Sequence, residues 1–77
     1  HSKTINLFTV ESNISKQLEH IQKKYEKFVE IGSYPFFRLG KIGVSVVSRS
    51  TSRTKLSNVK KDLLKVIKSK QIKILNI

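Results

Sequence analysis

The chain contains no cysteine, which excludes a disulfide framework and any thiolate metal site. His1 and His20 are the only imidazoles and lie far apart in the sequence, so a structural metal is not expected. No apolar run approaches the roughly 20 residues that a membrane-spanning helix needs, and the N-terminus lacks the basic-then-apolar pattern of a secretory signal. These absences predict a soluble, cytoplasmic domain with no membrane partner.

Carboxylates are scarce as well. The chain has five Asp and Glu residues against 16 Lys and Arg residues, a formal net charge of +11. Residues 38–77 hold most of the cations but a single carboxylate, Asp62, so nearly all of the excess charge lies in the second half. This asymmetry is typical of a surface that binds a polyanion such as nucleic acid. The alternative is a lysine-rich composition inherited from the source genome, which needs no ligand.

The sequence offers little support for catalysis. Apart from Asp62, which lies among lysines, the carboxylates fall in or beside the first predicted helix, so no paired acid and base can be recognised. No glycine-rich phosphate loop opens a helix, and no nucleophile lies beside a base. We therefore predict a non-enzymatic domain and assign no catalytic, cofactor-binding or metal-binding residue. His20 is expected on the exposed side of a helix.

Hydrophobic periodicity organises the chain into six elements. They are a strand over residues 4–10, a helix over 13–28, a short strand over 29–31, a strand over 42–47, a helix after Ser52, and a strand over 71–77. The helices carry apolar stripes spaced by three and four residues: Ile14, Leu18, Ile21, Tyr25 and Phe28, then Leu56, Val59, Leu63, Val66 and Ile67. Residues 1–3 are expected to be a tag remnant or a disordered start, and residues 4–77 a single small domain.

The order strand, helix, strand, strand, helix, strand predicts an α+β fold. In a chain of this length it favours a two-layer ferredoxin-like βαββαβ sandwich, with two helices on one face of a four-stranded antiparallel sheet. Ile42, Val44 and Val46 are expected to face the core. The other sheet face is expected to show Phe8, Val10, Ser45, Val47, Arg49, Leu75 and Ile77. Such a face is either a docking surface for a neighbouring domain or a second subunit, or ordinary apolar surface.

The best candidate binding site is a basic, hydroxyl-rich loop before the second helix. Arg49, Ser50, Ser52 and Arg53 offer guanidinium groups and hydroxyls beside the N–H groups of a helix start, a combination that suits a phosphate or another anion. Lys61, Lys65 and Lys68 are expected on one face of that helix and extend the candidate contact. The alternative is that Ser52 caps the helix and both arginines are solvated.

Two nucleic-acid motifs match the sequence only in part. Gly40-Lys41-Ile42-Gly43 matches the GXXG loop of KH domains, but it lies between strands and is expected to be part of a turn over residues 38–41. An RNA-recognition motif needs aromatic residues on its third strand, whereas residues 41–48 contain none. Phe8 on the first strand is expected to stack at most one base.

Two segments carry a family resemblance. Residues 29–37 contain the turn motif Gly32, Ser33, Tyr34 and Pro35, and residues 40–50 form a strand that ends in Val47-Ser48-Arg49-Ser50. In this order they resemble the region that follows the molybdopterin-binding-like domain in the family of competence-damage-inducible protein A and eukaryotic FAD synthases. The resemblance covers about residues 4–68, with Ser48 where family members often have leucine. The sequence leaves open whether the Tyr34–Pro35 bond is cis.

The resemblance implies a role beside another domain. It implies a non-catalytic accessory domain that makes packing or oligomer contacts next to a preceding molybdopterin-binding-like domain of the same chain. It implies no cofactor in this domain, with molybdopterin or a nucleotide bound elsewhere in the parent protein. A homo-oligomer is also compatible with this role. The alternative from a different class is a basic nucleic-acid-binding module.

Overall fold

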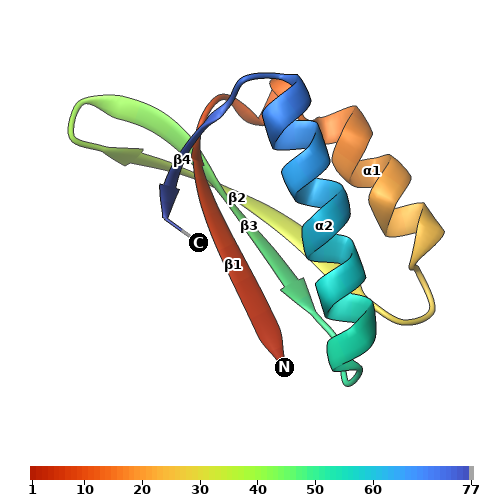
Figure 1. Ribbon diagram of the computed structural model, residues 1–77. Coiled ribbons are helices and arrows are strands. Elements are labelled where there is room, and N and C mark those ends of the chain that lie inside the picture. The colour runs from red at the N-terminus through yellow and green to blue at the C-terminus, as the bar shows by residue number, and fades with distance from the viewer. Residues whose placement is uncertain (77) are drawn as a thin grey trace.

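The computed structural model describes residues 1–76, which form one sheet and two helices (Figure 1). The elements are β1 (Ser2–Phe8), the 3₁₀ turn η1 (Glu11–Asn13), α1 (Ser15–Lys24), β2 (Glu30–Arg38), β3 (Lys41–Arg49), α2 (Arg53–Ser69) and β4 (Lys73–Asn76). Neighbouring strands are antiparallel, in the order β2-β3-β1-β4. This arrangement confirms the predicted ferredoxin-like fold. The predicted strand residue Ile77 lies outside the described residues.

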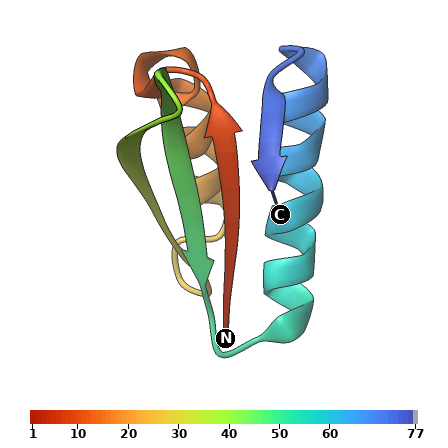
Figure 2. The same ribbon diagram turned by 90° about the vertical axis from the view of Figure 1, so that its left-hand side faces the viewer.

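One core lies between the helices and a single face of the sheet (Figure 2). Alternate residues of the central strands β1 and β3 point into it, as the period of two requires. The buried apolar side chains are Ile5, Leu7, Val44 and Val46 from the sheet, Val29 just before β2 and, from the two helical stripes, Ile14, Leu18, Ile21, Tyr25, Leu56, Val59, Leu63 and Ile67. Burial of each large aliphatic side chain stabilises the fold by about 1.5–3 kcal/mol, so these stripes hold the two layers together.

The first helix is shorter than predicted. It spans Ser15–Lys24 rather than residues 13–28, and its N-cap is Ile14, with no side-chain cap. The chain leaves the helix at Tyr25, whose carbonyl accepts from the backbone N–H groups of Phe28 and Val29. Phe28 is 54% exposed, so its predicted place in the buried stripe is wrong.

The strand bounds differ from the predicted ones. β3 is longer, at Lys41–Arg49 rather than 42–47, and β4 is shorter, beginning at Lys73 rather than at residue 71. β1 begins at Ser2, and Ser2 and Lys3 pair with Arg49 and Ser48, so the predicted bounds 4–10 are corrected to 2–8. Val10 lies beyond the strand and does not join the sheet face. The largest correction concerns β2, which continues unbroken to Arg38 rather than stopping at residue 31. β2 lies at the edge of the sheet, where a proline without an N–H group is tolerated.

β2 and β3 form a hairpin that projects beyond the helices, at the upper left of Figure 1. Its turn residues Leu39 and Gly40 have φ values of 55° and 72°, as a two-residue type I′ turn requires. The predicted turn over residues 38–41 is confirmed. Ile42 lies in the projecting part and is 55% exposed, so its assignment to the core is wrong.

Both ends of α2 are stabilised by local hydrogen bonds. The Ser52 hydroxyl accepts from the backbone N–H of Lys55 at 3.2 Å, which confirms the predicted N-cap. At the other end Ile72 N–H donates to Ile67 O and Gln71 N–H to Lys68 O, the pattern of a Schellman motif. Gln71 there adopts a φ of 55°. Within the described residues, neither helix has the length and apolar character that crossing a bilayer demands.

Candidate functional site

The predicted anion loop uses its hydroxyl groups to hold the fold together. The Ser50 hydroxyl donates to the Phe28 carbonyl and accepts from Ser52 N–H at 3.0 Å. The Ser50 backbone exchanges hydrogen bonds with His1, joining the end of β3 to the start of β1. Since the Ser52 hydroxyl caps α2, both serine side chains already have partners within the chain. The interpretation of Ser52 as a cap is supported, and a phosphate role for the two hydroxyls stays a prediction.

The two arginines of the loop lie against different surroundings. Arg49 borders a hollow that also contains the carboxylates Glu26 and Glu30, and Glu30 is its direct partner across β2 and β3. Arg53 lies with Lys3 and Lys60 around a separate hollow of about 450 Å³ near the start of α2. The predicted arginine pair therefore does not line one common hollow.

The lysines predicted on one face of α2 do lie together. Lys61, Lys65 and Lys68 line a shallow hollow of about 400 Å³. Tyr25, Asp62 and Leu64 share that hollow, so the surface also contains a carboxylate and apolar atoms. The gathering of the three lysines agrees with the predicted helical face, and their contact with a polyanion stays a prediction.

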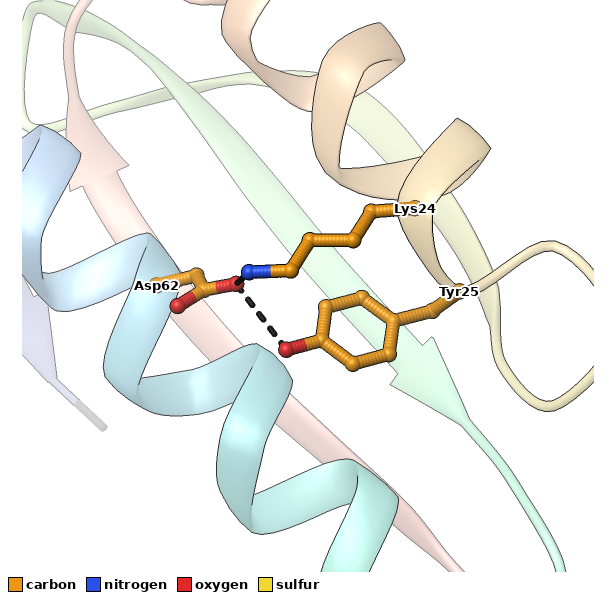
Figure 3. Close-up of polar contacts among 3 residues, drawn as sticks. All are labelled: Lys24, Tyr25 and Asp62. Carbon is orange, nitrogen blue, oxygen red and sulfur yellow. Dashed lines mark hydrogen bonds and ion pairs between the residues drawn. The ribbon is translucent and has the colours of Figure 1, made fainter.

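A small polar cluster joins the two helices beside these lysines (Figure 3). The carboxylate oxygen Oδ2 of Asp62 accepts from the Tyr25 hydroxyl at 3.0 Å and from Lys24 Nζ at 3.1 Å. The hydrogen bond to Asp62, together with its negative charge, raises the pKa of Lys24 above the ordinary 10.5. The Lys24 amine is exposed, so water screens the pair and its contribution to stability is small. The cluster positions α1 against α2, and the arrangement is structural.

The family turn motif does not form a turn. Gly32, Ser33, Tyr34 and Pro35 lie inside β2 and pair with residues 44–47 of β3. No cis peptide bond occurs in the described residues, so the Tyr34–Pro35 bond is trans. The Tyr34 ring lies against Gly32, where a Cβ atom would come within 2.9 Å of the Tyr34 hydroxyl oxygen. The motif therefore shapes an edge strand on which an aromatic ring lies over a glycine.

The projecting hairpin exposes three large apolar side chains, of which Phe37 and Leu39 had no predicted role and Ile42 was expected in the core. Phe37 is 73% exposed, Leu39 82% and Ile42 55%, and Phe37 and Ile42 are direct partners across the two strands. We call these three residues the hairpin arm. Phe37 was not assigned to the sheet because the strand was expected to end before Pro35.

The opposite side of the same hairpin brings aromatic rings and cations together. The Phe8 and Phe36 ring centroids lie 6.5 Å apart on the sheet face that the helices leave uncovered. The Arg38 guanidinium lies 5.4 Å from the Phe36 centroid, and Lys41 Nζ lies 5.3 Å from the Phe8 centroid. The sequence signal for this cluster was the alternation of Tyr34, Phe36 and Arg38, which becomes visible once the strand is extended through Pro35.

Comparison with known proteins gives one match. The model of a family described as FAD synthase, middle domain, matches residues 1–75. Neither a curated protein nor a solved structure matches the chain. The matched region takes in every helix of the fold, the hairpin arm and most of β4.

Proposed function

Given that the chain belongs to the family of FAD synthase middle domains, we propose that it is a non-catalytic accessory domain of a larger protein and packs against a neighbouring domain through its hairpin arm. The neighbour we propose is the molybdopterin-binding-like domain indicated by the sequence resemblance. The family match supports the FAD synthase side of that resemblance. The likeness to competence-damage-inducible protein A stays a prediction.

The observation that carries the proposal is the exposure of Phe37, Leu39 and Ile42 on a projecting hairpin, where Phe37 and Ile42 are direct partners across the strands. Three large apolar side chains gathered in this way on a small domain mark an interaction surface more often than a free one. Leucine is also unfavourable at this turn position, because the φ of 55° at Leu39 favours glycine or asparagine. Exposing an apolar side chain to water and holding leucine at a positive φ both cost free energy. Such a residue is expected where contact with a partner offsets that cost.

The test compares the isolated domain with the full-length protein that contains it. A triple variant, Phe37→Ser with Leu39→Asn and Ile42→Thr, removes the apolar arm. Because the three side chains are exposed, we expect the isolated variant to unfold within about 2 °C of the wild type. In the full-length protein the same changes should lower the unfolding temperature by several degrees and speed backbone hydrogen exchange in residues 37–42.

A matched control replaces Lys61 and Lys65 with glutamine, two exposed residues on the helical side of the molecule. This control should leave hydrogen exchange in the hairpin unchanged. Equal exchange rates at residues 37–42 in the isolated domain and the full-length protein would contradict the packing role. Light scattering on the isolated domain tests the alternative that the arm joins two copies of the chain, and FAD formation by the isolated domain would contradict a non-catalytic role.

A further inference from the structure

The uncovered face of the sheet has two chemically different ends. Side chains that alternate along β1, β2 and β3 point away from the helices, and the ones at the hairpin end are Phe8, Phe36, Arg38 and Lys41. Lys73 of β4 is the direct partner of Phe8 and adds a third cation there. At the far end of the same face Arg49 lies opposite the carboxylate of Glu30. Positive charge without a matching carboxylate is therefore confined to the hairpin end.

The Phe36 ring lies flat against the sheet, and the Phe8 ring is inclined to it by 58°. Gly43 is the direct partner of Phe36, and a Cβ atom built on Gly43 would collide with the Phe36 ring atoms Cζ and Cε1. Gly32 and Tyr34 repeat this arrangement further along β2. Because each glycine leaves room beneath a ring, the ring presents its broad face outward, and a planar ligand stacks on such a face.

The cations of this end lack anionic partners among the described residues. Arg38 and Lys41 are direct partners across the two strands, an arrangement in which like charges repel. The one ion pair in the described part of the chain joins Lys24 and Asp62 on the helical side. Arg38 and Lys41 instead lie over the phenylalanine rings, where their attraction to the π-electrons is modest at an exposed site. An anion that approached this end would relieve the repulsion.

We propose that the hairpin end of the uncovered sheet face binds a nucleotide that carries a planar ring and two or more phosphates. The ligand ring stacks on Phe36, and the inclined Phe8 ring borders it. Arg38 and Lys41 move from the ring faces to the phosphate oxygens, where Lys73 joins them. Arginine suits this role because its planar guanidinium both stacks and forms paired hydrogen bonds with phosphate. The inference rests on these rings and charges and is independent of the packing role of the hairpin arm, whose strand residues Phe37 and Ile42 point to the other side of the hairpin.

Charge placement favours a single nucleotide over a nucleic-acid strand. A strand that continued along the sheet would bring its next phosphates toward Glu30, whose carboxylate repels them. Proteins that bind single strands instead follow the backbone with a positively charged groove along its length. Three cations gathered around two rings match the phosphates and ring of one nucleotide.

The experiment measures binding to the 77-residue chain by calorimetry at about 150 mM salt, where weak surface electrostatics are screened. The probes are ADP and FAD, with adenosine as a ring without phosphate and pyrophosphate as phosphate without a ring. We expect ADP and FAD to bind with dissociation constants of about 10–100 μM and the two partial probes to bind at least about tenfold more weakly, because each loses one of two contributions. Amide NMR shifts on binding should be largest at residues 8, 36–43 and 73.

Two variants and a control locate the site. Arg38→Gln with Lys41→Gln changes exposed side chains and should weaken ADP binding by about tenfold or more. Lys16→Gln with Lys23→Gln removes the same charge from exposed positions of α1 and should change the affinity by less than about twofold. Phe36→Leu keeps apolar cover over Gly43 and should also weaken binding. The proposal is overturned if no probe binds below about 1 mM, if both charge variants lose affinity equally, or if a six-nucleotide single-stranded RNA binds while ADP does not.

Discussion

Alanine at Gly43 provides the sharpest test of how the strands fit together. A Cβ atom at this position would lie 2.6 Å from Cε1 of Phe36 and 2.7 Å from the Leu7 carbonyl oxygen. The Phe36 ring can turn outward, since the uncovered sheet face adjoins solvent. The Leu7 carbonyl cannot, because Leu7 pairs with Val44 on one side and with Ile74 on the other. Part of the collision therefore has to be absorbed by the backbone of a central strand.

The magnitude follows from two opposing effects. Forcing an extra methyl group into a packed site costs about 1–3 kcal/mol, and the backbone contact places Gly43→Ala in the upper part of that range. Replacing a strand glycine by alanine returns about 0.5–1 kcal/mol, because glycine loses more conformational freedom on folding. We expect a net loss of about 2 kcal/mol in the free energy of unfolding. For a domain of this size, that loss lowers the unfolding temperature by about 8–16 °C.

Gly32→Ala is the matched control, since it makes the same chemical change in the neighbouring strand. Its Cβ atom would meet the Tyr34 side chain, with the hydroxyl oxygen at 2.9 Å as the closest atom, and Tyr34 is 54% exposed and free to turn away. We expect a change of less than about 0.5 kcal/mol. Urea unfolding followed by circular dichroism at 25 °C measures both variants. Equal effects of the two substitutions, or no effect of Gly43→Ala, would refute the reasoning.

Three further changes test other parts of the structure. Gln71→Gly should raise the free energy of unfolding by about 0.5–1 kcal/mol in the same urea assay, because Gln71 occupies the left-handed position of the Schellman motif with a φ of 55°. Leu39→Asn should stabilise the isolated domain by a similar amount of about 0.5 kcal/mol through the type I′ turn; a loss would mean that Leu39 packs within the domain. Because Asp62 raises the pKa of Lys24, the stabilisation from their contact is complete below the ordinary pKa of 10.5 and is lost as the pH rises through the higher folded value. Unfolding followed between about pH 9 and pH 12 should therefore show a smaller loss of stability for Lys24→Met than for the wild type.

The sequence by itself determined the class of fold, because the two hydrophobic periods are local properties of the chain. The stripes at Leu18 and Ile21 and at Leu56 and Val59 predicted two helices with buried faces, and the structure buries them. The Ser52 cap was predictable for the same reason, since the serine and the N–H group it accepts from are three residues apart. The order of six elements then left few topologies for a chain of this length.

Only the tertiary structure decided the length of β2 and which side chains lie on each of its two faces. Pro35 and Gly32 weaken a strand locally, and for that reason the strand was expected to end at residue 31. Pairing with β3 along all nine residues overrides that local preference, since an edge strand tolerates proline. Pairing also brings Phe36 over Gly43 and sets Arg38 opposite Lys41, which are contacts between strands. Both the hairpin arm and the aromatic, basic end of the sheet follow from this register. It could not be read from the sequence because the local signals of Gly32 and Pro35 end the strand before the hairpin begins.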